Sequence, residues 1–234
     1  MFVTTHWSRV LAAGRNDTPH ARRALAELCE CYWYPLYAYV RQRGHSPHDA
    51  EDLTQEFFAR LLEKNPLGSL TPAGGKFRSF LLTALRHFLV DEWKKARRQR
   101  RGSGQVISLD ALEAEARFAR EPADTLTPER QFEQNWALVL LDSVYGQLQR
   151  EYEAEGRGGL FAELKSTLTG SPSSVPYAEL AARLGIAENT VKTSVHRLRQ
   201  RYRELLRAEV AQTVADPAEV DEELRCLFRA LAGP

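Results

Sequence analysis

The chain has 234 residues, of which 43% are hydrophobic and 27% charged, and its formal net charge is +1. This length allows one or two domains with substantial cores, and no apolar run approaches the roughly 18 residues of a membrane span. The first residues lack the charged-then-apolar pattern of a secretion signal. Three cysteines, an odd number, build no disulfide framework. We therefore expect a cytoplasmic protein without membrane association.

The near-neutral total conceals a polarised charge distribution. Residues 86–101 and 183–207 each carry seven Lys and Arg against two acidic residues, a net charge of +5 in each segment. Residues 110–133 and 209–229 each have a net charge of −4. Two basic patches separated by an acidic segment predict two contacts with one polyanion.

The first part of the chain predicts helices. Residues 4–13 favour a short leading helix, and a cap followed by proline opens a second helix over residues 18–44. Cys29 and Cys31 lie in this second helix, where their spacing puts them about 200° apart around the axis. They cannot readily share one ion, so we expect no metal site and no cofactor.

The helix predicted over residues 46–64 has two distinct faces. Its apolar residues, expected to face a core, are Leu53, Phe57, Phe58, Leu61 and Leu62. An acidic and polar stripe is expected to face outward, formed by Asp49, Glu51, Asp52, Gln55 and Glu56. Such a stripe repels DNA and suits an Arg-rich protein surface, although a solvated helix face explains the same pattern. Thr54, expected to be exposed here, is a candidate for phosphorylation.

A loop containing Pro and Gly, residues 65–75, precedes a long helix over residues 77–101. The first half of this helix is apolar on one side and would anchor it in a core. The second half is cationic and would lie along phosphates. Phe88 and Trp93 are either core residues or platforms on which unpaired bases stack.

Residues 101–129 are rich in Gly, Ser, Pro and acidic residues and predict a linker, with a short helix around residues 109–118. A helix then begins at Thr127 and Pro128, and a shorter helical piece covers residues 160–168. Asp216 opens a final amphipathic helix, which we expect to pack on the domain before it because an exposed apolar stripe of that length is a liability.

The stretch from Tyr177 to Leu205 predicts a helix-turn-helix. Leu180 and Leu184 lie one turn apart, Gly185 breaks the helix, and apolar residues recur at helical spacing from Val191 onward. The second helix would present hydrogen-bonding and cationic side chains to solvent: Asn189, Thr190, Lys192, Thr193, His196, Arg197, Arg199, Gln200, Arg201 and Arg203. This face suits base edges and phosphates in a major groove, although a solvated basic helix remains an alternative.

Two motifs together resemble bacterial RNA polymerase sigma factors of the extracytoplasmic-function (ECF) type. The sequence DAEDLTQEFFARLL, from residue 49, and the Phe-rich helix ending in LVDEWKKARRQRR at residue 101 resemble sigma region 2. The sequence LGIAENTVKTSVHRLR, from residue 184, resembles sigma region 4. Either motif alone is less specific, because helix-turn-helix units occur in many regulators.

The resemblance implies an all-α fold of two helical domains joined by a flexible acidic linker, the second domain containing a helix-turn-helix. The implied domains are residues 1–101, a region 2-like domain; 102–133, the linker; 134–210, a region 4-like domain; and 211–234, a C-terminal extension helix. The segment between residues 148 and 177 is longer and richer in Gly and Ser than the family pattern, and the tail after about residue 210 extends past the family's minimal core.

The resemblance also implies roles for individual residues. Core RNA polymerase, through the coiled coil of its largest subunit, would contact Asp49, Glu51, Asp52, Gln55 and Glu56. The −10 promoter element would be captured by Lys76, Arg78, Arg86, Trp93, Lys94, Lys95, Arg97 and Arg98. The −35 element would be read by Asn189, Thr190, Lys192, Thr193, His196, Arg197, Arg199 and Arg201.

The expected partners are therefore core RNA polymerase and promoter DNA. No nucleophile-and-base pattern or phosphate loop points to an enzyme. A stand-alone helix-turn-helix regulator that binds operator DNA is the alternative. The sequence leaves open whether an anti-sigma factor, phosphorylation or the C-terminal helix regulates activity.

Overall fold

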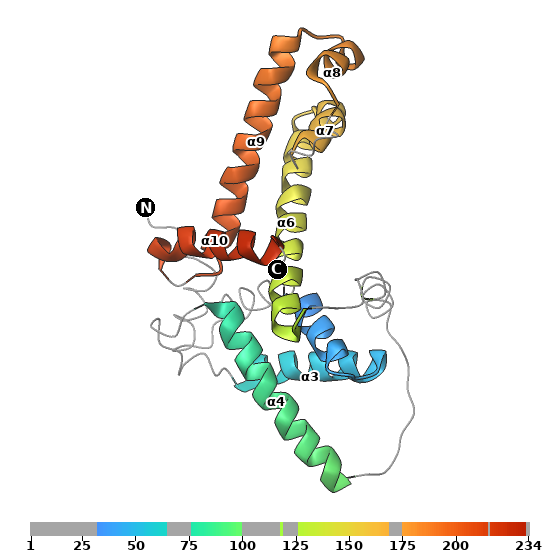
Figure 1. The fold of residues 1–234 in the computed structure, drawn as a ribbon, viewed down its shortest axis with the longest axis vertical. Helices are drawn as coiled ribbons and strands as arrows, with labels where there is room; N and C mark the ends of the chain where they lie inside the picture. The colour runs from blue at the N-terminus through green and yellow to red at the C-terminus, as the bar shows by residue number, and fades with distance from the viewer. Residues whose placement is uncertain are drawn as a thin grey trace. The chain divides into compact units, whose positions relative to one another are not determined.

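A computed structural model describes residues 32–64, 76–99, 118, 126–168, 175–214 and 216–232 (Figure 1). Helices and turns make up these ranges, and no strand occurs in them, so the predicted all-α fold is confirmed. The chain divides into two compact units. The first comprises Met1–Val139 with Val210–Pro234, and the second comprises Leu140–Glu209. The predicted leading helix, the loop at residues 65–75 and most of the predicted linker lie outside the described residues.

The first unit contains a helix ending at residue 42, α3 (Pro47–Lys64), α4 (Phe77–Gln99), the start of α6 (Pro128–Ala154) and α10 (Val220–Leu231). A short 3-10 helix, η4 (Pro217–Glu219), leads into α10, and the Asp216 side chain caps it by accepting from the Ala218 amide. The predicted cap of α3 is present, because the Asp49 amide donates to Ser46 Oγ at 3.1 Å. These helix starts follow local side-chain chemistry, which satisfies amides that have no partner within the helix.

Aromatic side chains dominate the core of the first unit. Tyr32 meets Phe77 edge-on with ring centroids 5.3 Å apart, and Phe57 lies 5.8 Å from Phe88. The predicted core residues of α3 that are buried are Phe57, Phe58 and Leu61. Burying one such side chain contributes roughly 1.5–3 kcal/mol, so these contacts fix which face of α3 remains for solvent.

The second unit contains the rest of α6, α7 (Gly158–Leu164), the 3-10 helix η3 (Lys165–Thr167), α8 (Tyr177–Leu184) and most of α9 (Glu188–Ala211). Within it, α6 and α9 run side by side (Figure 1). Its buried apolar residues come from α6, α7, α8 and α9 and include Val144, Leu148, Phe161, Leu164, Leu180, Val191, Val195 and Leu198. The apolar residues that recur at helical spacing in α9 therefore form its buried face.

The turn between α8 and α9 depends on Gly185. This residue has φ 63°, and the amide of the next residue, Ile186, donates to the Ala181 carbonyl at 3.1 Å. A left-handed residue with this bonding ends helices commonly, and glycine adopts it without the penalty of a Cβ. The next helix, α9, begins directly after this turn, and the Val191 amide donates to the Ala187 carbonyl at 3.2 Å in its first turn.

The C-terminal helix α10 belongs to the first unit. We expected the tail to pack on the domain that contains the predicted helix-turn-helix, and this expectation was wrong. The reason is a charged contact that local sequence does not show: Glu223 of α10 pairs with Lys76 and Arg78 at the start of α4.

Among the helices in the described ranges, none has both the length and the apolar character needed to cross a bilayer. No three His, Cys, Asp or Glu side chains gather at metal-binding distance in those ranges either. Cys29 and Cys31, considered above for metal binding, lie outside them, whereas Cys226 on α10 is a half-buried free thiol.

Candidate functional site

The acidic stripe of α3 is largely confirmed as an exposed surface. Asp49, Asp52, Gln55 and Glu56 are exposed. Their local contacts stay on the same helix: Asp52 lies 3.1 Å from His48 Nδ1, and Glu56 pairs with Arg60. Contacts of this kind between exposed side chains contribute little to stability. The four side chains therefore remain available to a partner.

Glu51 does not belong to the exposed stripe, and this part of the prediction was wrong. Its side chain is only 4% exposed and accepts from Gln55 Nε2 at 3.0 Å. Helical spacing explains the difference, because Glu51 shares a face with residues three and seven positions later, Thr54 and Phe58, which are both buried.

Thr54 is also buried, although we expected it to be exposed. It is 0% exposed, and its hydroxyl donates to the Ala50 carbonyl at 2.7 Å. A hydroxyl held inside a helix interface cannot reach a kinase without local unfolding, so the structure removes the basis for a phosphorylation switch at this position.

The two cations at the start of α4 point into the first unit. Arg78 is 5% exposed, lies 4.5 Å from the ring centroid of Trp136 and pairs with Glu223. Lys76 Nζ lies 2.8 Å from Glu223 Oε2. Both residues were expected to contact DNA, but in this conformation a carboxylate of the same chain occupies them.

Arg86, in the middle of α4, ties three helices together. It donates through Nε to Tyr39 Oη at 3.1 Å and pairs with Glu129 in the first turn of α6. Partial burial alone would raise the pKa of Glu129, but a backbone hydrogen bond and the Arg86 guanidinium hold that pKa below its ordinary value. This cation therefore holds the start of α6 beside α4.

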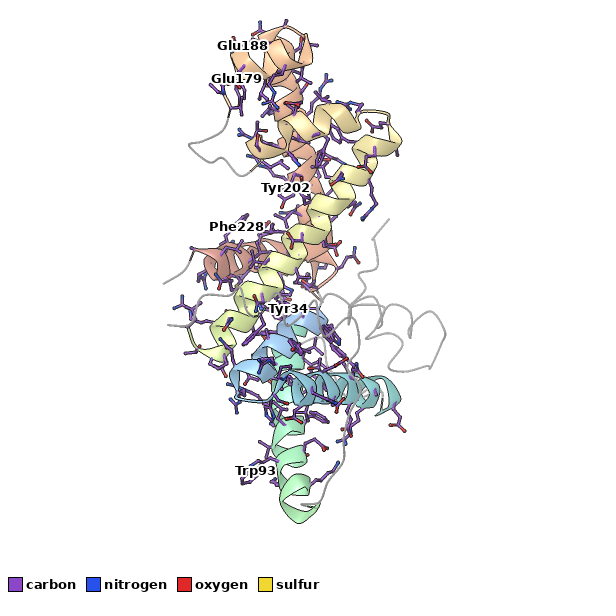
Figure 2. All side chains as sticks on the ribbon, turned by 90° about the vertical axis from the view of Figure 1, so that its right-hand side faces the viewer. Tyr34, Trp93, Glu179, Glu188, Tyr202 and Phe228 are labelled. Carbon is purple, nitrogen blue, oxygen red and sulfur yellow. The ribbon has the colours of Figure 1, made fainter. Side chains whose placement is uncertain are left out.

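The second half of α4 offers an exposed basic and aromatic surface. Trp93 is 59% exposed and projects from α4 near its C-terminal end (Figure 2). Lys94 and Lys95 are exposed, and their ion pairs with Asp91 and Glu92 lie on the same helix. Arg97 and Arg98 continue α4, with side chains outside the described set.

Phe88 and Trp93, the two aromatic residues of α4 considered for base stacking, differ in their exposure. Phe88 is buried against Phe57 and lies under the Arg60 guanidinium at 4.9 Å, so it is a core residue. Trp93, in contrast, is 59% exposed.

The exposed face of α9 is polar and cationic. The residues expected to read DNA that are exposed are Asn189, Thr190, Lys192, Thr193, His196, Arg197 and Arg201. Glu188, labelled in Figure 2, stands at the start of α9. Its Oε1 forms an ion pair with Lys192 Nζ at 2.8 Å. Because that pair is exposed and lies within one helix, it contributes little and a phosphate can replace it.

Two arginines of α9 make contacts within the second unit. Arg199 donates twice to the Thr167 carbonyl, from Nε at 3.0 Å and Nη2 at 2.6 Å. Arg201 holds Glu151 of α6 through two 2.8 Å hydrogen bonds, and this pairing lowers the pKa of the Glu151 carboxyl. Both arginines flank the buried stripe of α9 and brace the helix against its neighbours.

Sequence reasoning missed Glu223 as a functional candidate. A signal was present, because Glu223 stands three residues after Val220 and four before Leu227, which are both buried. A carboxylate on the apolar face of an amphipathic helix requires a cationic partner. The identity of that partner could not be read from the sequence, since Arg78 is 145 residues away.

Comparison with known proteins assigns part of the first unit to a known family. Residues 28–99, which include α3 and α4, match the family model of Sigma-70 region 2. Over 178 residues, 76% of this chain, the sequence is 27% identical to the ECF RNA polymerase sigma factor SigE of Mycolicibacterium smegmatis. It is also 34% identical over 104 residues, 44% of this chain, to the ECF RNA polymerase sigma factor BldN of Streptomyces coelicolor.

The chain contains a Sigma-70 region 2 and is similar to ECF RNA polymerase sigma factors. These comparisons support the predicted family. The alignments span 60% of the SigE relative and 36% of the BldN relative, so the chain matches only part of each. No solved structure matches it. The region 2 match covers both the acidic surface of α3 and the basic end of α4.

Proposed function

We propose that the chain is a promoter-specificity subunit that binds core RNA polymerase and directs transcription initiation at −10 and −35 elements. The observation that carries this proposal is the Sigma-70 region 2 match over residues 28–99. That match coincides with an exposed acidic surface on α3 and an exposed basic surface on α4. An operator-binding regulator needs neither of these surfaces.

The polymerase contact is assigned to Asp49, Asp52, Gln55 and Glu56. These side chains are exposed along one helix that a buried aromatic core holds in place. A rigid acidic stripe complements a basic coiled-coil surface and steers the encounter electrostatically. Glu51 is excluded from the contact by its burial.

The −10 contact is assigned to the C-terminal half of α4, with Trp93, Lys94 and Lys95 as its exposed residues. A cationic groove with an aromatic platform is the common arrangement for unpaired bases, since every base offers a face for stacking. Arg97 and Arg98 extend the same cationic run.

The −35 contact is assigned to α9, with α8 as the supporting helix of a helix-turn-helix. Asn189, Lys192, Thr193, His196 and Arg197 form the exposed face, and the first residues of such a helix enter the major groove. Initiation of this kind needs no bond-breaking chemistry in the chain, and the proposed place of action is the cytoplasm, where polymerase and DNA meet.

The decisive experiment combines the purified chain with core RNA polymerase. We expect co-elution in size-exclusion chromatography and transcripts that begin at defined sites on a template library with randomised upstream sequence. Binding to DNA without any association with core polymerase would instead support the stand-alone regulator.

A charge-reversal variant locates the polymerase contact. Asp52→Lys with Glu56→Lys should weaken association with core polymerase while leaving helicity unchanged. The matched control is Asp142→Lys with Glu153→Lys, the same change at two exposed acids of α6. Equal affinity of the α3 variant and the control would reject α3 as the contact.

A further inference from the structure

The carboxylate of Glu223 is the most deeply buried charge on α10. It is 1% exposed, whereas its neighbour Glu222 is exposed. Glu223 meets one cation just before α4 and one in its first turn: its Oε2 lies 2.8 Å from Lys76 Nζ, and its Oε1 accepts from Arg78 Nη1. One acidic side chain therefore neutralises both cations that begin α4.

The site around this carboxylate is built for an anion. Arg78 donates to Glu223, and its guanidinium carbon lies 4.5 Å from the ring centroid of Trp136. Glu133 is a more distant acid, at 3.9 Å from Arg78 Nε. A guanidinium oriented by an aromatic ring, with an ammonium beside it, matches the oxygens of a carboxylate or a phosphate equally well.

Stability alone accounts poorly for a pair of this kind. Removing two charges from water is costly, and replacing a buried ion pair with apolar residues is often neutral or stabilising. The remainder of the α10 contact face is apolar, with Val220 and Leu227 buried on either side of Glu223. An apolar residue at position 223 would satisfy the helix pattern, but Lys76 and Arg78 would lose the carboxylate that they share.

Open space adjoins the ion pair. A cavity of about 120 Å³ adjoins Arg78, and its lining also includes Arg130, Glu133, Cys226 and Arg229. Incomplete packing lowers the dispersion energy that holds α10 in place. Three arginines against one carboxylate leave the cavity lining net positive, which favours an anion that approaches Arg78.

We propose that Lys76 and Arg78 form a phosphate-binding site for promoter DNA, which Glu223 occupies in the free chain. Release of α10 exposes the site, and a backbone phosphate of the DNA then replaces the carboxylate. α10 therefore reduces DNA binding by competition for the same two cations. This inference rests on the proposed function, because it takes promoter DNA as the polyanion.

The test uses the full chain and a labelled promoter fragment chosen from the transcript mapping described above. Glu223→Gln removes the competing charge and keeps the side-chain shape. Because apparent affinity is reduced by the fraction of molecules in the competent state, we expect Glu223→Gln to bind this DNA about tenfold more tightly. The matched control Glu222→Gln, one residue away and exposed, should bind like the unmodified chain.

Adding Lys76→Gln to Glu223→Gln should return the affinity towards that of the unmodified chain, because one of the two phosphate ligands is then lost. Unchanged or weaker DNA binding by folded Glu223→Gln would overturn the proposal. If this variant fails to fold, hydrogen exchange on the unmodified chain tests whether DNA releases α10. Amides of residues 220–231 should then exchange faster when DNA is added. Unchanged exchange there would also overturn it.

These outcomes are distinct from failure of the proposed function. If the unmodified chain neither binds core polymerase nor supports initiation, the assignment as a promoter-specificity subunit fails. If it does both and Glu223→Gln behaves like Glu222→Gln, only the competition by α10 fails.

Discussion

Two arginines four residues apart on α9 should respond in opposite ways to replacement by alanine. Arg197 is exposed on the proposed DNA-reading face, whereas Arg201 is engaged with Glu151 of α6. We expect Arg197→Ala to impair DNA binding without loss of stability. We expect Arg201→Ala to impair stability with little loss of DNA affinity.

The magnitudes follow from the two environments. A base-contacting arginine is worth roughly 1–3 kcal/mol, which corresponds to about 5- to 150-fold in affinity. Arg201 makes two 2.8 Å hydrogen bonds to Glu151, but the pair is only partly buried, with side-chain exposures of 46% and 30%. Solvent screening limits such a pair to about 1 kcal/mol, and for a chain of this size that lowers the Tm by roughly 2–4 °C.

Two measurements separate the variants. Thermal unfolding followed by circular dichroism gives the change in Tm, and fluorescence anisotropy with −35 duplex DNA at a fixed salt concentration gives the affinity. Repeating the titration at several salt concentrations shows whether Arg197 contacts a phosphate, since the slope then falls by about one. The reasoning is refuted if Arg201→Ala, at a temperature where it is fully folded, loses as much affinity as Arg197→Ala.

Two further predictions concern stability. Because Arg201 holds the pKa of Glu151 below the ordinary value of about 4.3, the contribution of this pair is complete above that pH and is lost as the pH falls through the lowered pKa. Glu151→Gln should therefore destabilise the chain in urea unfolding at pH 7, and the difference from the unmodified chain should shrink in acid. Gly185→Ala should cost roughly 1–2 kcal/mol through its φ of 63° alone, because nothing lies within 4 Å of an added Cβ. Gly185→Asn, which tolerates this backbone region better, should cost less, and equal losses would show that the backbone conformation is not the cause.

Local signals in the sequence were sufficient for the helix pattern. The Ser46 cap, the Gly185 break and the apolar spacing of α9 each depend on residues within one or two turns of one another. Capping, left-handed termination and amphipathic burial are local effects, so they can be read without knowledge of the fold.

Side-chain roles that depend on distant partners could not be read in the same way. Arg199 and Arg201 have the composition of a DNA-reading face, but carbonyl and carboxylate acceptors 32 and 50 residues away hold them. Helical periodicity gives the angle of a residue around its own helix. The roles of Arg199 and Arg201 depend instead on the acceptors that other helices of the fold place opposite them.

The two ends of α4 should affect different steps of DNA binding. At its start, Lys76 and Arg78 pair with Glu223, so under the proposed competition they do not contribute to the first encounter. At its other end, Lys94 and Lys95 are exposed, and the ion pairs that they form among the described residues lie within the helix. Exposed charges act mainly on the association rate, and contacts that become buried act mainly on dissociation.

We therefore expect Lys94→Gln with Lys95→Gln to slow association with promoter DNA by a few-fold, with an effect that fades as salt increases. Lys76→Gln should leave association nearly unchanged and speed dissociation, because its phosphate contact forms only after α10 is released. Stopped-flow mixing of the polymerase complex with labelled DNA measures both rates. A slower association for Lys76→Gln, equal to that of the Lys94 and Lys95 variant, would mean that the start of α4 is open before DNA arrives, and Glu223 would then not be the competitor.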